Sequence, residues 1–119
     1  MADWKESFRE GKELVLSTCS SLARPNANIV ISLGFSGGRL MVADCSMATT
    51  IKNLKENPRI CVIGGYFKII GRAKIFNSGD VFRKCVEIVA SQDKTLKVKN
   101  AILVDAEAVF DLENAKKIA

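Results

Sequence analysis

The chain has 119 residues, of which 48% are hydrophobic and 26% are charged, and its formal net charge is +5. This composition is typical of one folded domain spanning residues 1–119 and excludes a disordered or low-complexity protein. No apolar run approaches the roughly 18 residues that a membrane-spanning helix needs. The charged N-terminal stretch also lacks the apolar core of a signal peptide, so we expect a cytoplasmic protein with no membrane partner.

The positive charge is compatible with an anionic ligand such as a phosphate or nucleotide. The basic residues form no block, however, and the sequence holds one Trp and one Tyr. A nucleic-acid surface usually interleaves cations with aromatic rings, so nucleic-acid binding is not expected.

Cysteine and histidine, which serve many catalytic and metal sites, offer little chemistry in this sequence. Cys19, Cys45, Cys61 and Cys85 form no C-x-x-C pair, so no metal site is predicted. We expect small buried thiols in a reducing compartment, with Cys45 the one near the candidate site. The sequence has no histidine, which removes the usual general base and the usual triads. Any chemistry must therefore come from a bound cofactor.

The first half of the chain predicts one short helix and then strands joined by turns. Residues 3–12 are expected to be helical, with Asp3 as N-cap. Apolar runs predict strands over 14–20, 27–35 and 39–43, separated by the turns "LARPN" and "SGG". Met47, Ile51 and Leu54 recur at helical spacing and predict a helix over 47–56, which Pro58 prevents from continuing.

The second half predicts a long β segment, a helix and a final strand. The β segment covers 59–76 and is broken at Gly64-Gly65. A helix capped by Ser78 should place Phe82, Cys85, Val86 and Val89 on its inward stripe. The strand over 101–112 should point Ile102, Val104, Ala106, Ala108 and Phe110 to one side.

Because hairpins dominate and β-α-β alternation is missing, we predict a mainly β fold. An antiparallel sheet closed as a barrel, with peripheral helices, fits this order of elements.

The stretch "DCSMATTIKN" lies where a strand gives way to a helix, and it is the candidate site. A helix that begins near Met47 leaves backbone N–H groups that bind phosphate well. Ser46, Thr49 and Thr50 could add hydroxyl donors, and Lys52 could add a charge. The alternative is that these hydroxyls are ordinary helix caps. Asn28 stands out because an amide in an apolar strand needs a partner from the backbone or a ligand.

The segment from Leu16 to Ile63 resembles the FMN-binding split-barrel family, which includes pyridoxamine 5′-phosphate oxidase. The resemblance rests on the order of strands, the hydroxyl-rich helix start, the tail "NLKENPRI" and the strand "YFKIIGRAKIF". It covers roughly residues 12 to 110. It implies an antiparallel, Greek-key-like six-stranded split barrel that binds FMN.

The resemblance also implies which residues hold the cofactor. The backbone at Val42, Ala43, Asp44 and Cys45 would run beside the isoalloxazine ring. Ser46, Thr49 and Thr50 would meet the phosphate. Residues Asn28, Ile29 and Val30 would approach the ribityl chain and the phosphate. The family implies a homodimer with FMN at its interface and a redox partner or small-molecule substrate that the sequence does not name.

Two departures from the family pattern shape the functional hypothesis. Family members usually carry Arg or Lys at one of the positions of Thr49 and Thr50, a role that Lys52 or Arg24 would have to take over. The end "DLENAKKIA" lacks the basic substrate segment of the true oxidases. We therefore expect a flavoprotein in electron or hydride transfer, one form of which is an FMN-dependent oxidoreductase. The alternatives are a deazaflavin or haem in the same groove, and a cofactor-free dimeric binding module.

Overall fold

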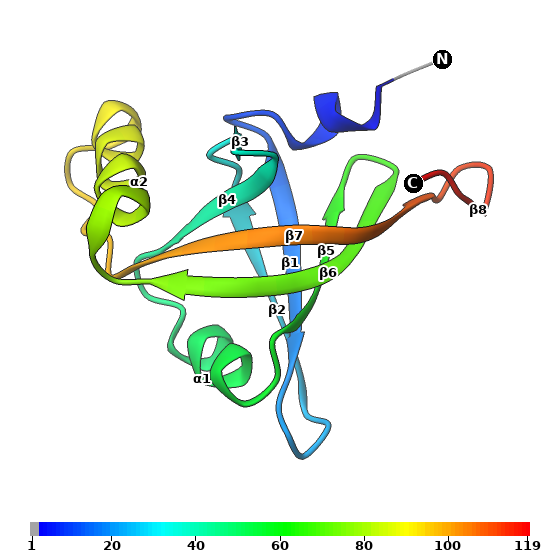
Figure 1. The fold of residues 1–119 in the computed structure, drawn as a ribbon, viewed down its shortest axis with the longest axis horizontal. Coiled ribbons are helices and arrows are strands. Elements are labelled where there is room, and N and C mark those ends of the chain that lie inside the picture. The colour runs from blue at the N-terminus through cyan, green and yellow to red at the C-terminus, as the bar shows by residue number, and fades with distance from the viewer. Residues whose placement is uncertain (1–2) are drawn as a thin grey trace.

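Antiparallel strands and two α-helices build the protein, for which a computed structural model describes residues 3–119 (Figure 1). In chain order the elements are the 3-10 helix η1 (Trp4–Phe8), β1 (Glu13–Cys19), β2 (Pro25–Ile31), β3 (Phe35–Ser36), β4 (Arg39–Asp44), α1 (Ala48–Glu56), β5 (Arg59–Gly64), β6 (Phe67–Phe76), α2 (Gly79–Gln92), β7 (Asn100–Asp111) and β8 (Lys116–Lys117). The predicted order of helices and strands is confirmed, with two short strands, β3 and β8, that the sequence did not predict.

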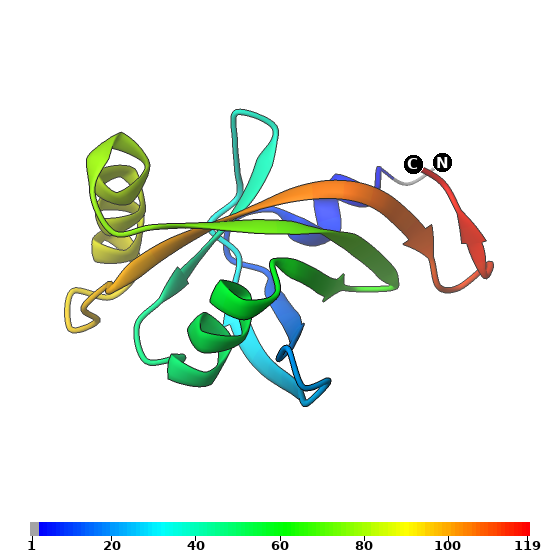
Figure 2. The ribbon, with the colours of Figure 1, turned by 60° about the horizontal axis from the view of Figure 1, so that its bottom comes forward.

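One sheet contains all the strands, in the order β2-β1-β5-β6-β7-β4-β3, with β8 added to β7. Figure 2 shows how the long strands β6 and β7 curve across the molecule from α2 to the end where β8 and the C-terminus lie. Among residues 3–119 no strand ladder joins β2 to β4, so the barrel is split between these two strands. The segment after β2 bridges the two sides of this split at one end. Ser32 N–H donates to Lys12 C=O (2.8 Å), next to β1, and Leu33 N–H donates to Met41 C=O (2.9 Å) of β4.

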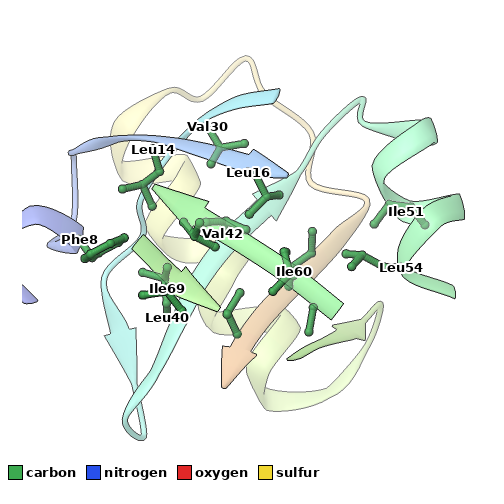
Figure 3. Close-up of a cluster of buried hydrophobic side chains, with 14 of the residues drawn as sticks. Phe8, Leu14, Leu16, Val30, Leu40, Val42, Ile51, Leu54, Ile60 and Ile69 are labelled. Carbon is green, nitrogen blue, oxygen red and sulfur yellow. The ribbon is translucent and has the colours of Figure 1, made fainter. Parts of the chain in front are cut away.

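The main core fills the inside of the barrel (Figure 3). Alternate residues of the strands point inward, so Leu14, Leu16 and Ile69 are almost fully buried. Phe8 of η1 lies at one end of this core, and Ile51 and Leu54 of α1 lie at the other (Figure 3). The helix α1 thus plugs the end of the barrel where β4 stops.

A second apolar cluster lies outside the barrel, under α2. Met41 of β4 and Leu103 of β7 point away from the main core and pack with Cys85 and Val89 of α2. These parts of β4 and β7 are therefore buried on both faces. Val86, expected on the inward stripe, is 39% exposed, and the half-buried Ile88 packs against the cluster in its place.

The predicted common face of residues 102–110 is wrong beyond Val104. Register shifts between Ile70 and Gly71, so that Ile70 pairs with Ala108 and Gly71 with Ala106. Such a bulge leaves one residue of β7 unpaired and changes which side the following side chains take. Val109 is consequently buried, whereas Ala106 is exposed.

Smaller predictions have mixed outcomes. Asp3 caps η1 as predicted, accepting from Lys5 N–H at 3.0 Å, but that helix ends at Phe8. Ser78 holds the N-cap position of α2 without a side-chain hydrogen bond. Cys85 is buried, whereas Cys19 and Cys61, on strands that expose one side, and Cys45, in the bend after β4, are only half-buried. No helix within residues 3–119 is long and apolar enough to cross a membrane.

Candidate functional site

The site is built where β4 ends and α1 begins. Asp44 closes β4, and its carboxylate accepts from Met47 N–H (2.7 Å) and from the Asn100 amide (2.8 Å). The backbone C=O of Asp44 accepts from Lys99 N–H at 2.8 Å. The bonds from Asn100 and Lys99 tie the junction to the start of β7, and the bond from Met47 closes the junction itself, so its backbone is held in one place.

The N-terminus of α1 faces outward without a side-chain cap. Met47 is the N-cap residue and its side chain makes no capping hydrogen bond. The first backbone bond of the helix runs from Ile51 N–H to Met47 C=O, at 3.0 Å. The preceding N–H groups, of residues 48–50, carry the partial positive charge of a helix start and suit an anion.

A cavity of about 460 Å³ opens at this junction and is strongly basic. Its lining residues are Asp44, Ser46, Met47, Ala48, Ile51, Lys52, Lys55, Lys99 and Asn100. Three lysines thus face a single carboxylate, which Met47 N–H and Asn100 already engage. The size lies within the range of small-molecule sites, and the charge favours an anionic group.

An apolar groove of about 210 Å³ adjoins the basic cavity, and the two share Ser46 and Met47. The groove runs along the split between β2 and β4 and under the end of α2. It is lined by Ile29, Val30, Ile31, Leu33, Ala43, Cys45, Ser46, Met47, Val89, Gln92 and Leu96. Ile29 is 73% exposed, which is unusual for a large aliphatic side chain in a strand.

Cys45 lies in this groove as a neutral thiol. Burial, and to a lesser extent the neighbouring charge of Asp44, raise the pKa of Cys45, while Lys99 opposes them. A raised pKa disfavours the thiolate, which is the nucleophilic and metal-binding form. Cys45 therefore contributes a small apolar wall, and no cluster of metal-binding residues occurs within the described part of the chain.

The two neighbouring threonines of α1 have opposite surroundings. Thr49 is exposed in the first turn, whereas Thr50 is completely buried. The Thr50 hydroxyl donates to Asn28 Oδ1 (2.5 Å) and accepts from the Asn26 amide (3.2 Å), which also donates to Asn28 Oδ1 (3.0 Å). We call Asn26, Asn28 and Thr50 the amide–threonine cluster. It joins α1 to β2, so the Thr50 hydroxyl and Asn28 Oδ1 are engaged within the protein.

The structure brings most of the predicted site residues together. Asp44, Ser46 and Lys52 line the basic cavity. Ile29, Val30, Ala43, Cys45 and again Ser46 line the apolar groove. Val42 points into the barrel core and offers only its backbone. Asn28 and Thr50 belong to the amide–threonine cluster, and Thr49 lies exposed beside the helix start.

The sequence alone did not indicate several lining residues. Lys99 and Asn100 reach the cavity because β4 pairs with β7, which places Asp44 opposite Asn100. The basic connector "DKTLKVKN" was a visible signal, but only the strand pairing shows that it returns to this site. Lys55 follows Lys52 by three residues and shares its helix face.

Comparisons with known proteins identify the family and the fold. The family model described as pyridoxamine 5′-phosphate oxidase matches residues 2–113. No curated protein matches the sequence. Among solved structures, HupZ of Group A Streptococcus is 14% identical with a TM-score of 0.83, covering 100% of both chains. HutZ, the heme storage protein of Vibrio cholerae, is 16% identical with a TM-score of 0.71, covering 90% of both chains.

An FMN-binding protein of Syntrophomonas wolfei subsp. wolfei has the same fold, with 13% identity and a TM-score of 0.69. The likeness covers 89% of this chain and 79% of that one. At such identities the structural likeness shows the split-barrel fold alone, whereas the family model spans nearly the whole sequence. This chain belongs to the pyridoxamine 5′-phosphate oxidase family.

Proposed function

We propose that the chain binds FMN at the β4–α1 junction and acts in electron or hydride transfer. One observation carries the proposal: a basic cavity at a helix start adjoins an apolar groove, and Ser46 and Met47 belong to both. FMN has the same division, with a phosphate at one end and a flat ring system at the other. The family match and the FMN-binding protein of similar fold support this choice of cofactor.

The residues present fit such a ligand. Backbone N–H groups at the start of α1, with Ser46, Lys52 and Lys99, would hold the phosphate. The aliphatic side chains beside Ile29 and Ala43 would contact the rings and exclude water from one side. When bound, FMN supplies the electron-transfer chemistry that no side chain of this site provides. The positions of Lys52 and Lys99 support the hypothesis that lysines replace the basic residue missing at Thr49 and Thr50.

A homodimer is part of the proposal, because the outer face of the sheet exposes apolar side chains. Val15, Ile29 and Ile31 are 38%, 73% and 43% exposed, and Val15 pairs with Ile29 across β1 and β2. An apolar face of this kind usually marks an association site. At one end of this face Glu13 pairs with Ile31 across β1 and β2, and at the other end Arg59 pairs with Arg72 across β5 and β6. This arrangement suits a two-fold interface, in which the acidic end of one copy lies against the basic end of the other.

Haem is the alternative cofactor, favoured by the likeness to the heme storage protein of Vibrio cholerae. The chain has no histidine, so iron would need a sulfur or tyrosine ligand. Cys45 and Met47 line the groove, but the raised pKa of Cys45 disfavours the thiolate that binds iron. A deazaflavin would use the same groove and is distinguished by its spectrum.

The experiment compares FMN with riboflavin, which lacks the phosphate, by quenching of flavin fluorescence. We expect FMN to bind at least tenfold more tightly. Lys99→Ala should weaken FMN binding about tenfold, the scale of one charge-assisted contact, and riboflavin binding less than twofold. Lys12→Ala is the matched control, because Lys12 is exposed and directly precedes β1, whose start lies at the opposite end of the barrel from α1 (Figure 1).

Equal affinity for the two flavins would show that the basic cavity does not hold the phosphate. Failure of both flavins to bind would favour haem or the cofactor-free binding module. Each result contradicts the proposal at a different point.

A further inference from the structure

A cavity larger than the basic one lies apart from the β4–α1 site. It has a volume of about 630 Å³ and shares no lining residue with the basic cavity or the apolar groove. Three distant segments meet there: η1, the turn between β5 and β6, and the chain from the end of β7 through β8. Figures 1 and 2 place these segments at the end of β7 near the C-terminus, away from α1 and α2.

Aromatic and aliphatic side chains form much of the wall, which we call the terminal pocket. Trp4, Tyr66, Phe67 and Ile118 line it. The Trp4 ring is held edge-on against Phe8, with ring centroids 5.9 Å apart. Tyr66 is 68% exposed and Ile118 is 39% exposed. Large apolar side chains that stay exposed around one hollow are typical of a ligand site, and aromatic walls favour a flat ring.

The backbone around the terminal pocket is held in place. Leu112 N–H donates to Tyr66 C=O at 2.8 Å, which ties the β5–β6 turn to the end of β7. Ile118 N–H donates to Val109 C=O at 2.8 Å, which fixes the last strand. At Gly65, which has φ +55°, an added Cβ would lie 2.9 Å from Ser7 Oγ, so the turn lies directly against η1. Hydrogen bonds and close packing within the protein therefore fix the backbone of the wall.

The charges that line the terminal pocket indicate which class of ligand it can bind. The lining holds two acids, Asp111 and Glu113, and two bases, Lys116 and Lys117, so its formal charge is zero. Asp111 also accepts hydrogen bonds from the Asn114 amide (2.8 Å) and from two backbone N–H groups, which lower its pKa. This balance differs from the basic cavity, where three lysines face one carboxylate. Because the lining has no net charge, it gives no net electrostatic attraction to a ligand with a phosphate or a free carboxylate.

We infer that the terminal pocket is a second binding site, which takes an uncharged planar heteroaromatic ring with a polar edge. The ring stacks among Trp4, Tyr66 and Phe67, and the polar edge meets Ser7 and the charged rim. The inference does not depend on the flavin proposal, because the two sites have no residue in common.

The test uses nicotinamide as an uncharged probe and nicotinate as its anionic counterpart. The chain has a single Trp, so ¹⁵N-labelled protein gives one indole N–H resonance, that of Trp4. We expect nicotinamide to shift this resonance with a dissociation constant on the order of 1 mM, reasonable for so small a ligand. Nicotinate should bind no more tightly. The titration is run with and without saturating FMN, and both should give the same affinity.

Variants locate the binding. Tyr66→Ala should weaken nicotinamide about three- to tenfold, the scale of one lost aromatic contact, whereas Tyr66→Phe should stay within about twofold. Lys52→Ala, in the basic cavity, should leave the affinity for nicotinamide unchanged. A Trp4 resonance that does not move, a tighter affinity for nicotinate, or an unchanged affinity of Tyr66→Ala would each overturn the inference. These readouts do not require that FMN binds, so this inference and the proposed function fail separately.

Discussion

Replacing Thr50 with valine tests whether the amide–threonine cluster fastens α1 to the sheet. Valine has nearly the same shape as threonine, so the change removes the hydroxyl without opening a cavity. Two hydrogen bonds are lost, the one to Asn28 Oδ1 (2.5 Å) and the one from the Asn26 amide (3.2 Å). At about 0.5 to 1.5 kcal/mol each they amount to roughly 1 to 3 kcal/mol.

Two effects reduce that loss. The added methyl group is buried, which returns up to about 0.8 kcal/mol. Asn28 Oδ1 also keeps its bond from the Asn26 amide (3.0 Å), so this oxygen is not left without a partner. The net expectation for Thr50→Val is a loss of about 1 to 2 kcal/mol in the free energy of unfolding, measured by urea denaturation.

Thr49→Val is the matched control, since the adjacent side chain is exposed and should change stability by less than about 0.5 kcal/mol. Equal stability of the two variants would refute the reasoning, because it would mean that the buried hydrogen bonds contribute nothing. The sequence predicts that the hydroxyls of Thr49 and Thr50 both contact the FMN phosphate. In the structure the Thr50 hydroxyl is bonded within the amide–threonine cluster, so only the Thr49 hydroxyl is free to reach the phosphate.

Three further predictions test other parts of the structure. Gly71→Ala should destabilise the fold by at least about 2 kcal/mol in urea, because a Cβ there would lie 2.0 Å from the Asp105 carbonyl oxygen. Gly37→Ala, with open space around it but φ +58°, should cost only about 1 kcal/mol, and the reverse order would contradict the register at the bulge. Burial raises the pKa of the Cys85 thiol from 9.0 to about 11. As the pH rises between these values the unfolded chain loses the thiol proton first, so the free energy of unfolding should fall by roughly 2 to 3 kcal/mol. Cys85→Ala should remove that pH dependence, and an unchanged slope would assign it to another group. Val15→Asp should convert the proposed dimer to a monomer in sedimentation equilibrium, and a wild-type protein that is monomeric would refute the outer-face interface.

Patterns of local origin could be predicted from the sequence. The alternation along "YFKIIGRAKIF" and the helical spacing of Met47, Ile51 and Leu54 depend on neighbouring residues alone, and both gave the observed elements. The strand-to-helix junction was also found in this way, because hydroxyl and basic residues gather beside it in the sequence.

Features that depend on distant pairing could not be predicted. The bulge opposite Gly71 arises where β6 meets β7, and nothing within "AILVDAEAVF" indicates it. Lys99 joins the site because β7 pairs with β4, and Thr50 is buried because β2 presents two amides to it. In each case a residue more than twenty positions away decides the outcome.

The most direct test of the flavin proposal is the visible absorption spectrum of the untagged protein, taken as purified and again after incubation with FMN and removal of the unbound cofactor. The proposal predicts the two visible bands of oxidised flavin, with FMN released as the chromophore on denaturation. A haem spectrum, or a protein that stays colourless after FMN has been supplied, would contradict it.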